Sequence, residues 1–128
     1  MSYYFAKTLS MPFEEAVKHT TDILKREGFG IITEIDVKDT LKKKINVDFR
    51  NYRILGACNP ALAYEALQLE DKVGTMLPCN VVVQETMQGK IEVAAIDPVA
   101  SMQAIDNKNL KLAAEKVQAK LRKVIENL

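Results

Sequence analysis

Residues 77–98, LPCNVVVQETMQGKIEVAAIDP, decide the fold of this chain. They contain two runs rich in β-branched residues, 77–87 and 90–96, and the Gln88-Gly89 pair between them can close a hairpin. The two strands of a hairpin are antiparallel. Asp97-Pro98 then combines a helix-capping side chain with a proline whose φ suits the first helical position, so a short helical turn is predicted to follow.

Outward from this hairpin, strands and helices alternate. Strands are predicted over 3–9, 29–35 and 52–58, each followed by a helix. The last helix, about Asn107 to Asn127, has a 4-3-4-3-4 apolar stripe that a coiled coil would also show, but the stripe is broad, as in a helix lying on a sheet. The order βαβαβαββα predicts an α+β, two-layer domain over 1–128. Its five-stranded sheet would be mixed, mostly antiparallel, with helices on one face.

Composition narrows the class of protein. A chain of 128 residues is long enough to bury a core without disulfides or metals, and its two cysteines are too few for a secreted disulfide scaffold. The 18 basic residues nearly balance the 17 acidic ones, which argues against a dedicated nucleic-acid-binding protein. No apolar run approaches the roughly 20 residues that span a bilayer, and no signal peptide is evident. We therefore expect a cytoplasmic protein with no membrane partner.

Strand direction predicts a cluster of polar and sulfur side chains at one edge of the sheet. A helix joins strands 29–35 and 52–58, which favours a shared direction. If strand 77–87 runs opposite to strand 52–58, the ends of four strands meet there. If those two strands are instead parallel, the cluster dissolves. The residues placed at this edge are Glu34, Asp36, Cys58, Asn59, Cys79, Asn80 and Asp97.

Such a cluster suggests two kinds of chemistry. The position of Cys58, directly before a helix cap, favours thiolate, and two thiols with a carboxylate could hold a soft metal ion such as zinc, with Cys58 and Cys79 as ligands. The alternative is structural, because Asn and Asp at these positions are explained as helix caps and cysteines are often small buried hydrophobes. Gly56, inside a strand, indicates a bulge or a close approach by a ligand or another chain segment, or else a closely packed helix.

Several familiar sites are absent from the sequence. His19 is the only histidine, so neither a Cys₂His₂ zinc site nor a Ser-His-Asp triad has enough support. The two cysteines lie twenty-one positions apart rather than in a C-x-x-C pair, and no glycine-rich phosphate-binding motif occurs. A conventional enzyme therefore has little support in the sequence.

Four stretches carry a family resemblance: EIDVKDTLKKKI (34–45), YRILGACNP (52–60), LPCNVVV (77–83) and DP (97–98). They resemble domain-of-unknown-function family 302, a widespread prokaryotic family, over nearly the whole chain. The resemblance implies an α+β fold like half of the TATA-binding-protein saddle, and a homodimer. It supplies no activity, and the fold likeness does not carry DNA binding with it. It also implies that the quoted stretches meet at the edge described above.

We expect a homodimeric, cytoplasmic binding module that takes a small ligand or a soft metal ion at the Cys58/Cys79 edge and is not an independent enzyme. Two alternatives stay open. One is a thiol-dependent enzyme with Cys58 as nucleophile. The other is a purely structural or regulatory dimer in which these residues serve capping and packing. Exposed strand edges are the predicted dimer interface, because an unpaired edge favours pairing with another strand.

Overall fold

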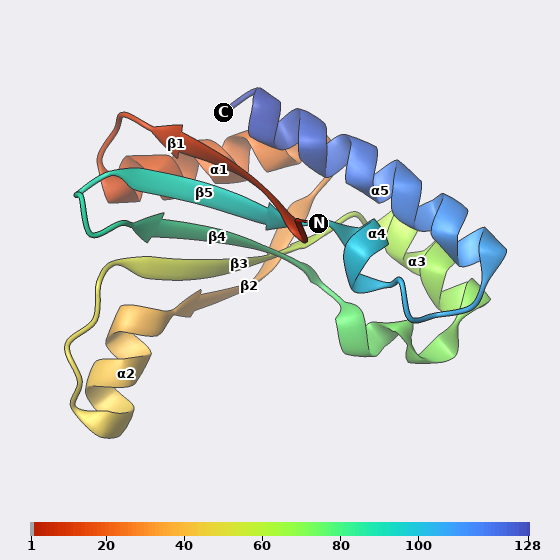
Figure 1. Cartoon of the computed structure of the whole chain (residues 1–128), viewed down its shortest axis with the longest axis horizontal. Helices are drawn as coiled ribbons and strands as arrows, with labels where there is room; N and C mark the ends of the chain where they lie inside the picture. The colour runs from red at the N-terminus through yellow and green to blue at the C-terminus, as the bar shows by residue number, and fades with distance from the viewer. Residues whose placement is uncertain (1) are drawn as a thin grey trace.

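The computed structural model describes residues 2–128, and it confirms the α+β class and the predicted order of elements (Figure 1). A 3₁₀ helix, η1, is an element that the sequence analysis did not predict. The elements are β1 Tyr4–Leu9, α1 Phe13–Arg26, β2 Gly30–Asp36, α2 Val37–Ile45, β3 Tyr52–Cys58, α3 Pro60–Leu69, η1 Asp71–Met76, β4 Cys79–Glu85, β5 Ile91–Ile96, α4 Pro98–Ser101 and α5 Lys108–Glu126.

The five strands form one sheet in the order β1-β5-β4-β3-β2, and every neighbouring pair is antiparallel. β4 runs opposite to β3, which is the condition on which the predicted cluster depended. The expectation of a mixed sheet in which β2 and β3 share a direction is wrong. A crossover helix must lie across a face of the sheet, whereas α2 buries no residue and projects beyond the sheet (Figure 1). Residues 46–51 then lead back to the end of the sheet that β2 had just reached.

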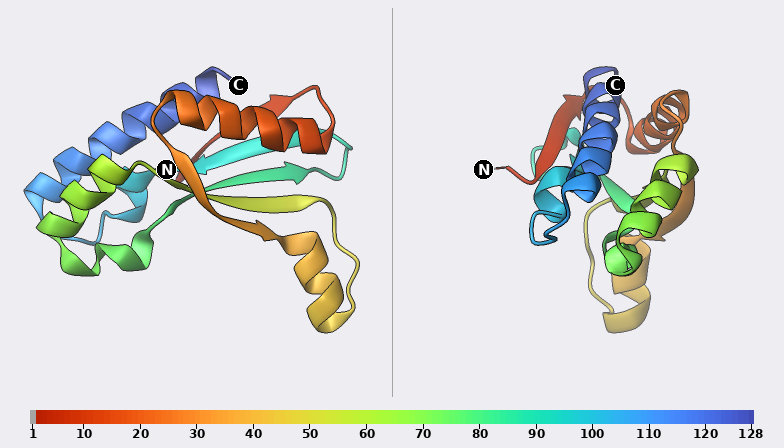
Figure 2. Two further views of the ribbon diagram at one scale, coloured as in Figure 1. Left: turned by 180° about the vertical axis from the view of Figure 1, so that it is seen from behind. Right: turned by 90° about the vertical axis from the view of Figure 1, so that its right-hand side faces the viewer.

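Helices α1 and α5 cover one face of the sheet (Figure 2). The strands alternate accordingly: every second residue of β4 and β5 is buried, including Val81, Val83 and Val93 at 0% exposure. These valines pack in one cluster with residues of both helices, such as Leu24 and Leu121. The stripe on α5 is therefore the face of a helix lying on a sheet, as the sequence favoured.

α5 is longer than the sheet that it covers. Its second half packs on the main core through Leu121 and its neighbours, while its first half extends past the strands. There Leu110 and Ala114 join a second hydrophobic cluster with Val73 of η1 and Met102, which follows α4. The described part of the chain thus forms two hydrophobic clusters, and α5 connects them.

Gly56 marks a close approach between neighbouring segments. The register of β2 against β3 shifts between Ile31 and Thr33, which is a bulge opposite Gly56. A Cβ atom on Gly56 would collide with the side chains of Thr33 and Pro78. The glycine therefore allows the bulged strand and the start of β4 to approach β3 closely.

Candidate functional site

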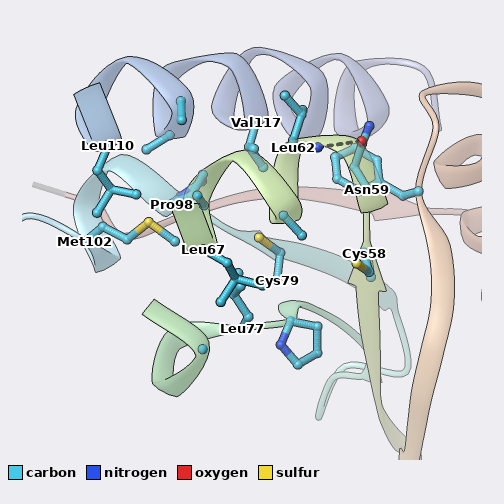
Figure 3. A pocket seen from close by; sticks show the side chains of 18 of the residues that line it. Cys58, Asn59, Leu62, Leu67, Leu77, Cys79, Pro98, Met102, Leu110 and Val117 are labelled. Carbon is cyan, nitrogen blue, oxygen red and sulfur yellow. Dashed lines mark hydrogen bonds between the residues drawn. The ribbon is translucent and has the colours of Figure 1, made fainter. Parts of the chain in front are cut away.

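A cavity of about 310 Å³ lies between the two hydrophobic clusters, where the end of the sheet meets α3, η1, α4 and α5 (Figure 3). The sheet supplies Ala57, Cys58 and Cys79, and the helices supply most of the remaining wall. Two exposed hydrophobic residues, Ile32 and Leu67, also line the cavity and border its open side. The further apolar side chains in the lining are Phe29, Leu62, Ala63, Ala66, Leu77, Pro78, Pro98, Met102, Leu110, Ala113, Ala114 and Val117.

The antiparallel pairing of β3 and β4 brings both cysteines to this cavity. Cys79 lies directly opposite Ala57, and Cys58 is the next residue along β3. Both thiols are free, with Cys58 half-buried and Cys79 buried. Burial, together with a smaller contribution from the nearby Cys58 thiol, raises the pKa of the Cys79 thiol to about 11. Cys79 is therefore a neutral thiol at neutral pH.

Asn59 fixes the start of α3 beside the cavity. Its side-chain oxygen accepts a hydrogen bond from the Leu62 backbone N–H at 3.3 Å, and Pro60 occupies the first helical position, as the sequence predicted. The other end of its side chain lies against Gly28, where φ is +86° and a Cβ atom would come within 2.9 Å of Asn59 Nδ2. Gly28 ends α1, so a single side chain links the end of α1 to the beginning of α3.

The wall of the cavity carries no charge. Among residues 2–128, Asn59 and the two thiols are the only polar side chains in the wall, and no Asp, Glu, Lys, Arg or His lines it. Residues 2–128 also contain no group of three His, Cys, Asp or Glu side chains arranged to hold a metal ion. The four-ligand site that zinc prefers is thus incomplete here, and neither a carboxylate nor an imidazole stands beside Cys58 as a general base.

Two of the other predicted site residues lie near this end of the sheet but outside the cavity. Asp97 caps α4 by accepting from the Val99 N–H at 3.0 Å, and it also accepts from Gln118 Nε2 at 3.0 Å. Its oxygens are therefore engaged within the fold. Asn80 pairs with Gly56 and lies on the face of the sheet that α1 and α5 leave uncovered, since side chains alternate along a strand.

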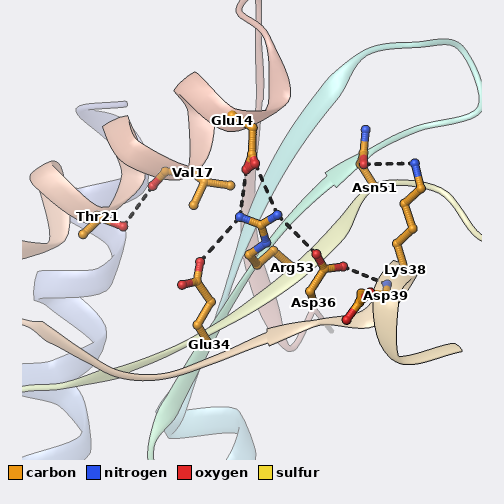
Figure 4. A network of polar contacts seen from close by, with 9 residues as sticks. All are labelled: Glu14, Val17, Thr21, Glu34, Asp36, Lys38, Asp39, Asn51 and Arg53. Atoms are coloured by element: carbon orange, nitrogen blue, oxygen red, sulfur yellow. Dashed lines mark hydrogen bonds and ion pairs between the residues drawn. The ribbon is translucent and has the colours of Figure 1, made fainter. Parts of the chain in front are cut away.

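Asp36 lies beside the beginning of β3 and Glu34 beside its middle, away from Cys58 at its end, so the prediction that they join the cysteines is wrong. Because β2 runs antiparallel to β3, Asp36 pairs with Arg53 while Gly30 pairs with Cys58. Both carboxylates face the Arg53 guanidinium, with oxygens 3.6 Å and 3.5 Å from its nitrogens (Figure 4). Asp36 also caps α2 by accepting from the Asp39 N–H at 3.0 Å, as predicted.

Arg53 has a third partner. Glu14 of α1 accepts from both terminal nitrogens of the guanidinium, at 2.8 and 3.3 Å. Burial lowers the pKa of Arg53, but the hydrogen bonds that Arg53 donates to Glu14 and the charges of Glu14, Asp36 and Glu34 outweigh this effect, so the pKa is raised. The cluster ties α1 to the sheet, and its charges are used within the fold.

The sequence analysis identified the cysteines and Asn59 but missed the apolar part of the site. The broad apolar stripe of α5, which includes Leu110, was predicted to lie on the sheet, and nothing in the sequence indicated that α3 and α5 leave a space between them. Met102 carried no signal at all. The length of α5 gave a hint, because 19 helical residues extend about 28 Å whereas seven strand residues extend only about 23 Å.

The fold and the site define a class of protein: an α+β protein whose antiparallel sheet carries helices on one face and an uncharged, sulfur-containing cavity beyond its end. The chain belongs to the family described as "Domain of unknown function DUF302", whose model matches residues 5–128. It is similar to the crystal structure of an uncharacterized conserved DUF302 protein from Bacillus stearothermophilus. The two are 26% identical, the match covers 98% of each chain, and the TM-score is 0.91. None of the curated proteins matches the chain.

In residues 2–128, no helix combines the length and the apolar character needed to cross a bilayer.

Proposed function

We propose that this protein is a binding module for a small, uncharged, largely apolar ligand held in the cavity between the end of the sheet and α3 and α5. The observation that supports this proposal is that none of the described residues in the wall of the cavity of about 310 Å³ is charged. Ligand sites are mostly apolar hollows of roughly 300–1,000 Å³ with few polar groups. A charged ligand would lose its hydration here without gaining a partner.

Volume sets the size of the ligand. An apolar cavity of about 150 Å³ accommodates one benzene ring, so about twice that volume suits a molecule of two fused rings. The two free thiols, half-buried Cys58 and buried Cys79, are the polar groups available to orient it. The exposed Ile32 and Leu67 side chains at the open side mark the entry route.

Two probes of similar size and different charge test the proposal: neutral 2-naphthol and anionic 2-naphthoate, titrated by calorimetry at pH 7. We expect 2-naphthol to bind one per chain and 2-naphthoate to bind at least about tenfold more weakly, because the anion would be desolvated without a counter-charge. Equal binding of the two probes, or no binding of 2-naphthol, would contradict the proposal.

Two alanines of α3 provide a matched pair of variants. Ala63 lines the cavity, whereas Ala61 is exposed and does not. Ala63→Leu should fill part of the volume and weaken 2-naphthol binding about tenfold or more, while Ala61→Leu should leave it unchanged. If both variants bind like the parent, the probe sits elsewhere.

Thiol catalysis by Cys58 has less support than binding, since the cavity wall supplies no base to activate the thiol. The homodimer implied by the family resemblance stays a prediction, and β1 and β2 are the edge strands that could pair between copies. Light scattering on a dilute solution tests it: we expect twice the 14.4 kDa mass of one chain, and a monomer would contradict the prediction.

A further inference from the structure

A second hollow adjoins the cavity at the end opposite Cys58. It has a volume of about 330 Å³ and lies between α4 and α5. Three residues line both spaces: Met102, which follows α4, and Leu110 and Ala114 of α5. Figure 3 shows Met102 and Leu110 at the end of the cavity, with Cys58 at its other end. The cavity and the second hollow therefore meet at these shared side chains.

The second hollow is polar where the cavity is apolar. Its wall contains five charged or amide side chains, none of which lines the cavity: Asp97, Gln103, Lys111, Glu115 and Gln118. Ligand sites combine apolar surface with a few polar groups that fix the orientation of the ligand. An apolar space that adjoins a polar one therefore suits a molecule with an apolar body and a polar end.

Asp97 can still accept a hydrogen bond from such a polar end. Within residues 2–128, its Oδ1 atom accepts from the Val99 and Ala100 N–H groups and from Gln118 Nε2, whereas its Oδ2 atom accepts from Gln118 alone, at 3.2 Å. A carboxylate oxygen has two lone pairs, so Oδ2 can accept a second hydrogen bond. A hydroxyl group supplies that donor without bringing a charge.

Met102 is the movable part of the boundary between the two spaces. Leu110 and Ala114 are fixed on the 19-residue helix α5. Met102 follows a helix of only four residues, and a methionine side chain is unbranched and has three rotatable bonds. A change in the Met102 rotamer therefore opens the boundary without any movement of α5.

We propose that the ligand is an uncharged amphiphile with a linear apolar chain and a hydroxyl-bearing head group. The chain lies in the cavity, and the head group lies in the second hollow and donates to Asp97 Oδ2. The chain enters tail first past Met102, whereas a wholly apolar molecule enters at the open side beside Ile32 and Leu67. This inference rests on the proposed function, because it adds a polar end to the apolar ligand of the cavity. No charge enters the uncharged cavity.

Octyl glucoside, kept below its critical micelle concentration, is the probe. We expect it to bind one per chain and to displace 2-naphthol, because both occupy the cavity. Methyl glucoside should bind at least about 100-fold more weakly, since it has no chain to bury. If 2-naphthol binds but octyl glucoside does not displace it, the inference is overturned and the proposed function stands. If 2-naphthol does not bind, both are overturned.

A pair of alanines locates the head group. Ala100 lines the second hollow and not the cavity, whereas Ala104 is exposed and lines neither. Ala100→Leu should fill part of the second hollow and weaken octyl glucoside binding about tenfold, with 2-naphthol binding unchanged. Ala104→Leu should leave the binding of both probes unchanged. If Ala100→Leu bound octyl glucoside as the parent does, the head group would lie elsewhere and the inference would be wrong.

Nuclear magnetic resonance gives a readout in the unaltered protein. With ¹³C-methyl-labelled methionine, octyl glucoside should move the Met102 methyl signal and leave that of Met87, which is 96% exposed, in place. The side-chain amide signal of Gln118 should shift with octyl glucoside and not with 2-naphthol, because Gln118 lines the second hollow and not the cavity. An unmoved Met102 or Gln118 signal at saturation would mean that the head group stays at the open side, and would overturn the inference.

Discussion

The two ends of β3 show two different uses of polar side chains. At its beginning, Arg53 is surrounded by three carboxylates that pair with its two terminal nitrogens, whereas its Nε is buried without a partner, and the cluster connects α1 to the sheet. At its end, Cys58 borders an uncharged hollow whose polar groups are few and mostly unused by the fold. The charges of the Arg53 cluster are used in contacts within the chain. The hollow beside Cys58, in contrast, leaves an unfilled volume and free thiol groups available to a ligand.

This difference separates structural residues from candidate functional ones. A charged cluster is conspicuous in a sequence, yet here its charges pair with one another and leave nothing for a ligand. Cys79 and Met102 are inconspicuous because they are apolar enough to be core residues, and each is only 7% exposed. We assign these two residues to the candidate site because they border a volume that no other side chain fills.

The largest effect that we expect concerns Cys79 at alkaline pH. Its pKa is raised from an ordinary value of 9.0 to about 11 by burial, so the folded state keeps the thiol protonated while the unfolded state ionises it. This contribution to stability is complete below pH 9 and is lost as the pH rises through 11. Two pKa units correspond to about 2–3 kcal/mol.

Urea unfolding between pH 8 and 11 measures this loss, and Cys79→Ala is the control because it removes only this titration. The parent should lose about 2–3 kcal/mol more than the variant over that range. Parallel pH profiles for the two proteins would mean that Cys79 is not buried in solution. The description of the cavity end of β3 as an apolar, water-excluding site would then be wrong.

A somewhat smaller effect tests the charged end. Arg53→Met keeps an apolar stem near the Phe13 ring, whose centroid lies 5.3 Å from the guanidinium carbon, but leaves Glu14, Glu34 and Asp36 without their common cation. We expect a loss of about 2 kcal/mol, less than for a fully buried pair because the carboxylates are about half exposed. Chemical denaturation at pH 7 measures it.

The same variant should leave 2-naphthol binding unchanged, since no residue of the Arg53 cluster lines the cavity. If Arg53→Met weakened binding while the protein stayed folded, the two ends of β3 would be coupled, and the separation of a structural end from a binding end would be wrong.

The sequence predicted much of the fold because turns and helix caps are local signals. Gly89, with φ at +74°, closes the β4–β5 hairpin, and Asn59 and Asp97 both cap helices as their positions before proline indicated. Strand direction was harder to predict. The connections on either side of β3 both contain a helix, and both join antiparallel strands. Helix α2 buries none of its residues, and only this feature distinguishes the β2–β3 connection from a helical crossover between parallel strands.

The candidate site was predicted in part because some of its residues are neighbours in the sequence. Cys58 and Asn59 are sequence neighbours, and Cys79 joins them because β4 runs opposite to β3 and pairs with it, a direction that the sequence analysis could state only as a condition. Glu34 was assigned to the site only through the wrong direction of β2. The cavity itself depends on how far α5 extends past the sheet and on how α3 packs against it, which are tertiary distances that no local pattern encodes.

The smallest expected effect concerns the cap that joins the cavity to the main core. Asn59→Ala removes the hydrogen bond to the Leu62 N–H and should cost about 1 kcal/mol. Asn59→Asp is the matched variant, because its carboxylate can accept the same bond at the positive end of α3, and it should recover most of that stability. Thermal and urea unfolding of the two variants compare them directly.

The cap variants also sharpen the comparison beyond stability. Asn59 holds the first turn of α3, which carries Leu62 and Ala63 of the cavity wall, so Asn59→Ala should weaken 2-naphthol binding along with stability. Hydrogen exchange should then quicken in the first turn of α3 and remain unchanged around Arg53. If exchange quickened equally at both places, the cap would stabilise the whole molecule rather than this wall, and α3 could not be treated as a separately adjustable side of the cavity.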